Sequence, residues 1–440
     1  MGKEDAKMPM LEPGQILKTI SGVRIRVESF IAEGGQGEVY RVDYNGEKKA
    51  LKWYKPEALR DPILFYDNLK TNAAKGSPDK AFLWPDAVTE YVGGTFGYVM
   101  GLRPEGYYEL SKILGSRKCN FVSFKAAAEA CIRIVSAFRI LHNNGYSYQD
   151  LNDGNFFINP QTGDVLICDT DNIAKNGTST GILGKPRYMA PEIVNGKGKV
   201  LPDTQSDRYS LAAILFLILF NNHPLEGSHW VMVTCMTDDV AEKLYGSAPL
   251  FIFDQSNRSN APVRNLQISV IERWAFMPPY LKEKFVTAFS QDALKNPGKR
   301  LRELDWLQVL VRFRSDIVRC TCGNEVFIQN AATTKCDVCG KPVAVTHTIK
   351  LPGYAITAAG GSRVYRCMLG TCNADEALNP VACVVTRKDK PGVLGFRNMS
   401  GRILNATTPS GKPKQIKPND VIPFNPGIVI EAFEKKIELN

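Results

Sequence analysis

Residues 146–192 read YSYQDLNDGNFFINPQTGDVLICDTDNIAKNGTSTGILGKPRYMAPE, and the rest of the chain can be placed from this stretch. Asp150 and Asn155 lie five positions apart in a segment rich in turn residues. The apolar run VLIC then leads to a second acidic pair, Asp169 and Asp171, and the stretch ends in the tetrapeptide MAPE. Carboxylate and amide oxygens in this order indicate a site that handles a hydroxyl group and a divalent cation.

Phosphoryl transfer to a hydroxyl requires a carboxylate that orients the nucleophile and oxygen ligands for magnesium. Asp150 suits the first task, and Asn155 and Asp169 suit the second. The segment resembles the protein kinase superfamily: YQDLNDGN stands where kinases carry the HRD…N catalytic loop, DTD stands in place of DFG, and APE is unaltered. The resemblance implies an α+β fold of two lobes that binds ATP with Mg²⁺ or Mn²⁺, with Asp150 as the catalytic carboxylate.

A glycine-rich segment lies upstream between two runs that alternate in the manner of strands. Ala32, Gly34, Gly37 and Val39 occupy the positions of the kinase pattern G-x-G-x-x-G-x-V, with alanine in place of the first glycine. Glycines allow backbone N–H groups to approach phosphates closely. Fifteen residues after Gly37 comes Lys52, which by resemblance contacts the α- and β-phosphates of ATP.

In kinases this lysine pairs with an acid on the following helix. The segment DPILFYDNLKTNAAKGSP reads as the start of that helix, and Asp67 lies on it, fifteen residues after Lys52. Glu57 is the other candidate, but it follows Pro56 closely and would precede the helix. We therefore predict a pair between Asp67 and Lys52, with a solvent-facing Asp67 as the alternative.

The segment FGYVMGLRPEG reads as a buried strand that runs into a linker. By resemblance, Met100 lies beside the adenine pocket, and residues 101–103, including Leu102, form the hinge whose backbone meets the adenine edge. Core packing alone would also explain Met100, and the two roles are compatible.

Two residues beyond MAPE match structural positions of kinases. Asp207 precedes the apolar run LAAILFLILF, and by resemblance it holds the backbone of the catalytic loop. Arg300 matches the arginine that forms a buried ion pair with the APE glutamate, here Glu192. We expect a flexible tail at residues 1–15 and then a kinase domain at residues 16–318. Its N-terminal lobe spans about residues 16–100 and its C-terminal lobe about residues 104–318.

Gln149 stands where many kinases carry the arginine that grips a phosphorylated activation loop. We therefore predict that activity does not require phosphorylation of Thr178, Ser179 or Thr180.

Asn152 replaces the lysine that steadies the γ-phosphate in Ser/Thr kinases, and Lys185 replaces a threonine of the activation segment. In kinases these two positions face each other across the catalytic aspartate, so Lys185 is predicted to supply the charge that Asn152 lacks. A surface lysine is the alternative. Asp171 belongs to a DFG equivalent that has lost Phe and Gly, and it is either a second metal ligand or a turn residue.

Four cysteines have the spacing C-x-C, thirteen residues, then C-x-x-C: Cys320, Cys322, Cys336 and Cys339. Glycine follows each pair, as in the knuckles of zinc ribbons, so residues 319–345 are predicted to hold a structural Zn²⁺ ion on four thiolates. A redox dithiol and an unoccupied cysteine cluster are the alternatives. Eleven cysteines placed this unevenly indicate a reducing compartment rather than a disulfide framework.

Residues 346–440 change to short alternating runs separated by Gly, Pro and Asn turns, which predicts a small β-sandwich. The stretch GFRNMSGRILNATTPSG resembles forkhead-associated domains, although the residues with which those domains read phosphothreonine are not clearly present. We interpret this part as a protein-interaction module.

A narrower resemblance rests on KGSPDKAFLWP, SYQDLNDGNFFI, ICDTDNIA, GKPRYMAPEIV and HPLEG. Together they resemble bacterial kinases linked to tellurite resistance, which belong to a phosphorylation triad. That resemblance implies Ser/Thr phosphorylation and two partners, a PP2C-like phosphatase and a von Willebrand A-domain protein.

The chain has 440 residues and a formal net charge of +10. Its basic residues are spread along the sequence, which favours a basic surface suited to phosphate ligands over a nucleic-acid interface. No N-terminal tract has the form of a signal peptide, and the most apolar run, residues 211–220, is too short to span a bilayer. We expect a cytoplasmic protein without a membrane span.

Two other functions fit parts of the sequence. The departures from the kinase pattern would suit a pseudokinase, a nucleotide-binding scaffold that recruits partners through its C-terminal third. The residues for metal and hydroxyl handling are all present, however, which favours an active kinase. Phosphorylation of a small molecule such as an aminoglycoside is disfavoured by the intact APE segment, which in kinases builds a peptide-docking surface.

Overall fold

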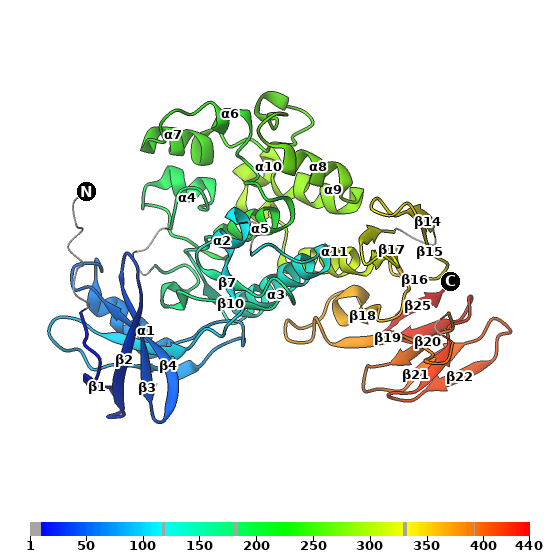
Figure 1. The fold of residues 1–440 in the computed structure, drawn as a ribbon, viewed down its shortest axis with the longest axis horizontal. Coiled ribbons are helices and arrows are strands. Elements are labelled where there is room, and N and C mark those ends of the chain that lie inside the picture. The colour runs from blue at the N-terminus through cyan, green and yellow to red at the C-terminus, as the bar shows by residue number, and fades with distance from the viewer. Residues whose placement is uncertain (1–9, 117–118, 180, 182–183, 329–331, 391) are drawn as a thin grey trace.

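The computed structural model describes residues 10–116, 119–179, 181, 184–328, 332–390 and 392–440. A strand-rich lobe, a helical lobe and a group of C-terminal strands follow one another along the chain (Figure 1). The strand-rich lobe and the C-terminal strands lie at opposite ends of the helical lobe. The first two parts form the two-lobed α+β arrangement that the sequence predicted.

The N-terminal lobe is an antiparallel six-stranded sheet with one helix against it. The strands, in their order across the sheet, are β1 (Ile16–Lys18), β2 (Arg24–Glu33), β3 (Gly37–Tyr44), β4 (Glu47–Tyr54), β6 (Gly97–Gly101) and β5 (Ala87–Val88). The helix is α1 (Pro62–Lys75), whose N-terminus is capped by the side chain of Asp61. At the start of β3, a Cβ atom on Gly37 would lie 2.2 Å from the carbonyl oxygen of Trp53, so only glycine fits this close approach of two strands.

The predicted flexible tail is wrong for its last residues. Leu11 is buried in the core of the N-terminal lobe, and its N–H donates to the hydroxyl of Tyr40 at 3.0 Å. The N–H of Gly14 donates to the carbonyl of Val27 at 2.8 Å. Residues 10–15 therefore pack as part of the lobe, because Leu11 finds an apolar site there, and residues 1–9 lie outside the described part.

Two long helices form the centre of the C-terminal lobe. They are α3 (Phe124–Asn143), which begins at an N-cap serine, Ser123, and α5 (Thr204–Phe220), which begins at a capping box on Asp203. Nearly every side chain of α5 is buried, which explains its continuous apolar sequence. The other helices are α2 (Leu110–Gly115), α4 (Pro191–Gly196), α6 (Ser228–Val231), α7 (Asp238–Glu242), α8 (Ile268–Phe276), α9 (Pro279–Ala288), α10 (Gln291–Lys295) and α11 (Glu303–Ser315).

Short strand pairs fix the two acidic segments beside each other. Strand β8 (Tyr146–Ser147) pairs with β11 (Ala174–Lys175), and β9 (Phe156–Ile158) pairs with both β10 (Val165–Ile167) and β7 (Tyr108–Glu109). The segment with Asp150 joins β8 to β9, and the segment with Asp169 joins β10 to β11. Because β8 pairs with β11 and β9 pairs with β10, the two acidic segments between these strands lie beside each other.

The C-terminal third contains two hairpins and two packed sheets. The hairpins are β12 (Ile317–Arg319) with β13 (Glu325–Phe327) and β14 (Ala332–Lys335) with β15 (Pro342–Val345). The larger sheet has the order β17 (Tyr354–Thr357), β16 (Thr348–Leu351), β25 (Lys435–Leu439), β24 (Val429–Ala432), β21 (Leu404–Thr407) and β22 (Pro413–Ile416). The smaller sheet has the order β18 (Arg363–Tyr365), β19 (Pro380–Thr386), β20 (Leu394–Asn398) and β23 (Val421–Pro423).

The C-terminal strands are packed directly on the helical lobe. One cluster of buried apolar residues runs from Trp306 on α11 to Phe396 in the smaller sheet. The side chain of Gln308 donates to the carbonyl of Cys367 at 3.0 Å. The rings of Phe313 and Phe327 stack with their centroids 5.2 Å apart. The helical lobe and the C-terminal strands thus share one core.

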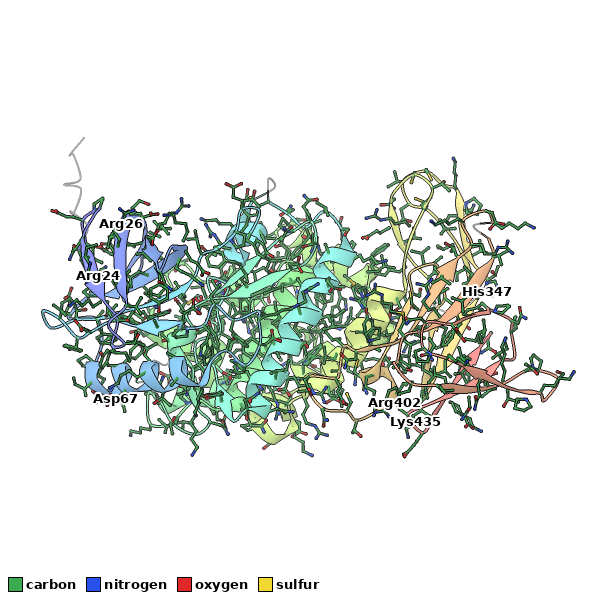
Figure 2. The ribbon with its side chains drawn as sticks, turned by 90° about the horizontal axis from the view of Figure 1, so that it is seen from below. Arg24, Arg26, Asp67, His347, Arg402 and Lys435 are labelled. Carbon is green, nitrogen blue, oxygen red and sulfur yellow. The ribbon has the colours of Figure 1, made fainter. Side chains whose placement is uncertain are left out.

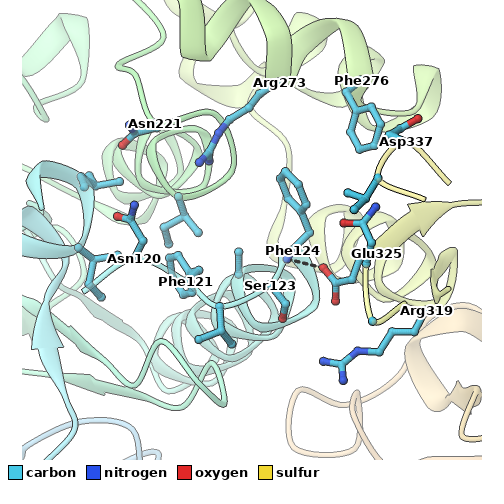
Figure 3. A pocket seen from close by; sticks show the side chains of 18 residues that line it. Asn120, Phe121, Ser123, Phe124, Asn221, Arg273, Phe276, Arg319, Glu325 and Asp337 are labelled. Atoms are coloured by element: carbon cyan, nitrogen blue, oxygen red, sulfur yellow. Dashed lines mark hydrogen bonds between the residues drawn. The ribbon is translucent and has the colours of Figure 1, made fainter. Parts of the chain in front are cut away.

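A second contact joins the first hairpin to the start of α3. The carboxylate of Glu325 accepts a hydrogen bond of 2.6 Å from the N–H of Phe124 (Figure 3). A cavity of about 460 Å³ lies beside this contact, and Arg273, Phe276 and Asp337 are among the residues that line it. A carboxylate at a helix N-terminus is favourable because it meets unpaired N–H groups and the positive end of the helix dipole.

Among the described residues, every helix is too short or too polar to cross a lipid bilayer.

Candidate active site and metal site

The segment from Tyr148 to Asn155 is shaped by hydrogen bonds to its backbone. The carboxylate of Asp207, at the start of α5, accepts from the N–H of Tyr148 at 2.6 Å and from the N–H of Gln149 at 3.1 Å. The side chain of Asn155 donates to the carbonyl of Asp150 at 2.8 Å. Asp207 thus has the contacts that the sequence predicted, and it holds the loop in the conformation that presents Asp150.

The carboxylate of Asp150 accepts from the side chain of Asn152 at 3.2 Å and from that of Asn172 at 3.4 Å. Burial raises the pKa of Asp150 to about 6, against the hydrogen bond from Asn152, which lowers it. The group is therefore ionised at neutral pH but basic enough to accept a proton from a bound hydroxyl.

Lys52, on β4, is buried between the two lobes. Its Nζ atom lies 2.7 Å from Asp171 Oδ2, 3.2 Å from Asp169 Oδ1 and 3.0 Å from Gln36 Oε1. Burial alone would lower the pKa of Lys52, but the two carboxylates raise it, so the lysine stays charged. The structure thus joins Lys52 of the N-terminal lobe to both acids of the segment after β10.

The predicted pair between Asp67 and Lys52 is wrong. Asp67 lies on the outer face of α1, where Figure 2 shows it pointing away from the rest of the molecule. Its carboxylate pairs instead with Lys70 at 2.7 Å, and its side chain is 59% exposed. The reason is helical geometry: Phe65 and Leu69 face the core, and position 67 lies two residues from each of them, on the opposite side of the helix.

The residues present fit a divalent cation. Asp169 offers a side chain that is 37% exposed, and within the described part of the chain no protein donor meets Asn155 Oδ1. Asp169 also adopts a left-handed backbone conformation with φ of 51°. For a residue other than glycine this conformation is uncommon, and it occurs often at functional sites. Asn155 and Asp169 are the residues that would hold Mg²⁺.

Comparison with known protein families identifies this region. The model of the protein kinase domain matches residues 98–265, which include Asp150, Asn155 and Asp169. This part of the chain is therefore similar to a protein kinase domain. The match begins in β6, so the glycine-rich segment and Lys52 precede it.

Curated relatives are also kinases. Protein kinase YegI of Escherichia coli O157:H7 is 22% identical over 78% of this chain and 53% of its own length. The DNA damage-responsive serine/threonine-protein kinase RqkA of Deinococcus radiodurans is 29% identical over 49% of this chain and 32% of its own. Protein kinase C-like 1 of Candida albicans is 32% identical over 25% of this chain and 10% of its own. The chain thus spans about half of the length of YegI and smaller shares of the other two.

Within the matched region, Lys185 lies close to the loop that carries Asp150. Its Nζ atom is 3.3 Å from the Oδ1 atom of Asn152, and the Nδ2 atom of Asn152 in turn donates to Asp150. Its charge is among the influences that lower the pKa of Asp150. The structure therefore brings together the two positions that the sequence predicted to face each other.

Gln149 contacts the activation segment through a neutral hydrogen bond. Its side-chain amide donates to the carbonyl of Thr178 at 2.6 Å and to the hydroxyl of Ser147 at 3.1 Å. Like Asp169, Gln149 has a positive φ, here 73°. Because the contact is to a backbone carbonyl, it needs no phosphate on Thr178.

The structure also places the other positions that the sequence predicted. Ala32 pairs with Val39 across the β2–β3 hairpin, and the turn between them contains Gly34. Met100 is buried at the end of β6, and Leu102 follows in the linker. The predicted pair of Arg300 and Glu192 is present, with nitrogen–oxygen distances of 2.7 and 2.6 Å.

Some contacts of the site were not found from the sequence. Tyr54 donates its hydroxyl hydrogen to Asp171, and Asn68 and Asn72 both donate to the carbonyl of Ile173 at 2.9 Å. The sequence signal for the role of Asp171 was indirect. Helix α1 carries a single acid, on its outer face, while the DTD motif carries one acid more than DFG.

The four cysteines of the hairpins form a second candidate metal site. Their sulfur atoms all lie within 4.8 Å of one another, with 3.5 Å between Cys320 and Cys339 and 3.6 Å between Cys322 and Cys336. Zinc–sulfur bonds of about 2.3 Å at a tetrahedral angle separate two sulfurs by about 3.8 Å, so the cluster fits Zn²⁺. Gly323 and Gly340 both have positive φ, as the turn of each knuckle requires.

Proposed function

We propose that the chain is an ATP-dependent protein serine/threonine kinase. The observation that carries the proposal is the meeting of Asp150, Asn155 and Asp169 of the C-terminal lobe with Lys52 of the N-terminal lobe. Phosphoryl transfer depends on positioning and on charge stabilisation, and these residues supply both.

Each residue has a role in the proposed reaction. Asp150 orients the substrate hydroxyl and accepts its proton, and Lys52 contacts the α- and β-phosphates. Asn155 and Asp169 hold Mg²⁺, which when bound neutralises charge on the phosphates. The loop from Ala32 to Val39, with Gly34 and Gly37, covers the nucleotide. Lys185 contributes the positive charge that Asn152 does not carry, and the adenine meets Met100 and the backbone near Leu102.

A protein substrate is favoured over a small molecule. Glu192 of the APE motif is held by Arg300, so the segment that forms the peptide-docking surface in kinases is anchored here as well. The sequence lacks the D-L-A-A-R-N form of tyrosine kinases, and RqkA carries a serine/threonine name. These observations support serine and threonine as acceptors.

The finer assignment follows the narrower resemblance. We propose that the kinase works in a tellurite-resistance-associated triad with a PP2C-like phosphatase and a von Willebrand A-domain protein, and that Cys320, Cys322, Cys336 and Cys339 hold a structural Zn²⁺. The C-terminal sheets then serve as an interaction module.

Label transfer tests the proposal. Purified full chain is incubated with ATP labelled in the γ-phosphate and Mg²⁺, alongside Asp150→Ala, and transfer to the chain itself and to a generic basic protein is measured. We expect transfer that the substitution lowers by at least about a thousandfold, because the hydroxyl loses its base and its orienting group. Tight nucleotide binding without any transfer would instead favour the pseudokinase scaffold.

A further inference from the structure

The buried lysine of the site needs a permanent counter-ion. Lys52 is 6% exposed, and an ammonium group removed from water is stable only when it is paired and hydrogen-bonded. Its two carboxylate contacts, Asp169 and Asp171, come from one short segment of the C-terminal lobe. The exposure of these two acids differs: the side chain of Asp169 is 37% exposed and that of Asp171 is fully buried.

This difference separates two roles. A metal ion that arrives with the nucleotide can reach the partly exposed Asp169. Asp171 is closed off from solvent: its Oδ2 atom is shared by the ammonium of Lys52 and the hydroxyl of Tyr54, and its Oδ1 atom is buried without a hydrogen-bond partner among the described residues. Once Asp169 binds the metal, Asp171 is the carboxylate that remains with Lys52.

Helix α1 does not compete for the lysine. Its acid, Asp67, pairs with Lys70 on the outer face. The inner face presents two amides, Asn68 and Asn72, which donate to the carbonyl of Ile173. Helix α1 is therefore attached to the backbone just beyond Asp171 and makes no ionic contact with Lys52 among the described residues.

We propose that Asp171 is the positioning residue of Lys52, in the place that a glutamate of the helix occupies in other kinases. The inference rests on the proposed function. It follows that Lys52 is positioned by residues 169–173 and Tyr54. In other kinases the lysine pairs with a glutamate of the helix after its strand, and movement of that helix breaks the pair. In this chain the ion pair of Lys52 does not depend on α1.

The first test is steady-state kinetics of Asp171→Asn, which keeps the shape of the side chain and removes its charge. We expect the turnover number to fall by about ten- to a hundredfold, as for a lost hydrogen bond to a charged group. The Mg²⁺ concentration for half-maximal activity should stay unchanged. The matched control is Asp67→Ala, which should leave both quantities unchanged.

Two results would overturn the proposal. An unchanged turnover number would show that Asp171 does not position the lysine. A several-fold rise in the Mg²⁺ requirement, with the turnover number restored at high Mg²⁺, would make Asp171 a second metal ligand.

A double-mutant cycle tests the ion pair without measuring activity. Thermal unfolding of Asp171→Asn should occur at a lower temperature than that of the wild type, because the buried Lys52 loses the nearer and fully buried one of its two carboxylates. Adding Lys52→Met should recover most of this loss, since the uncompensated charge is removed. Additive losses in the double variant would contradict the pair. The cycle remains informative even if the wild type transfers no phosphate.

Discussion

Lys185 and Asn152 both differ from the residue types that kinases carry at these positions, since the lysine is on the activation segment instead of the catalytic loop, and the contact between them gives this change a physical meaning. The Lys185 ammonium lies 3.3 Å from Asn152 Oδ1, and Asn152 also donates to Asp150. A positive charge at this place can stabilise the charge that develops on the transferred phosphoryl group, whichever segment supplies it.

Lys185→Ala is expected to lower the turnover number by about ten- to a hundredfold, because a charge-assisted contact made in the transition state is lost. The apparent affinity for ATP should change much less. Steady-state kinetics at varied ATP measure both quantities. Lys199→Ala, at an exposed lysine, is the matched control. An unchanged turnover number for Lys185→Ala would reduce this residue to a surface lysine.

The sequence was informative about single residues where a motif fixes their spacing. Asp150 and Asn155 lie between the short strands β8 and β9, Asp169 follows β10, and Lys52 lies on β4, so their places along the chain bring them together. Which of two neighbouring acids turns inward depends on the packing around Tyr54, which no local pattern reveals. This is why the role of Asp171 stayed open, whereas the outward position of Asp67 follows from the helical spacing of Phe65 and Leu69.

At the scale of secondary-structure elements, the C-terminal lobe is held together beneath the catalytic loop by a buried histidine. His142, in the last turn of α3, contacts Asp207 of α5 at 3.1 Å and Glu303 of α11 at 2.9 Å, and Glu303 is also paired with Arg208. Burial alone would lower the pKa of His142, but the two carboxylates raise it to about 9. The protonated form therefore joins three helices.

The stability of the protein should fall as the pH rises from about 6.5 to about 9. The histidine is charged in both the folded and the unfolded state below its unfolded pKa, so its contribution is complete there and is lost through the folded pKa. For a shift of this size the loss is about 3 kcal/mol. Chemical unfolding of the wild type and His142→Gln across this range measures it. The slope should be much smaller in the variant, and equal slopes would contradict the assignment.

The activation segment yields a second prediction at this scale. Gln149 donates to the backbone carbonyl of Thr178, and this contact survives removal of the side-chain hydroxyl. Replacing Thr178, Ser179 and Thr180 by alanine should leave peptide phosphorylation within about twofold of the wild type, since no charged grip on a phosphate is involved. Gln149→Ala, which removes the contact itself, should lower activity more than the triple substitution. An inactive triple variant would show that phosphorylation is required.

Elements with a clear period were predictable, whereas their contacts were not. The apolar run of α5 indicates a buried helix, and the alternating runs on both sides of the glycine-rich segment indicate the strands β2 and β3. That residues 10–15 pack on the N-terminal sheet depends on Tyr40 and Val27, which are distant in sequence. Such long-range contacts leave no local signature.

For the whole molecule, the sequence suggested three modules, and the structure shows that the helical lobe continues into the C-terminal third. Phe313 stacks on Phe327, and the neighbouring Glu325 contacts the first turn of α3, which leads to the catalytic loop. The turn of the hairpin that carries these contacts contains two of the four cysteines, Cys320 and Cys322. Metal binding at the cysteines should therefore stabilise the surface of the helical lobe against which this hairpin packs.

Zinc content and thermal unfolding test this coupling. The purified chain should contain one zinc per molecule, and a chelator or Cys336→Ser should remove the metal and lower the unfolding temperature of the helical lobe by several degrees. The reason is that a metal that binds the folded state stabilises all parts that fold with it. Cys235→Ser, at an exposed cysteine outside the cluster, should alter neither quantity. If the metal leaves and the unfolding temperature stays the same, the hairpins are an independent unit and their contacts with α3 and α11 contribute nothing to the stability of the helical lobe.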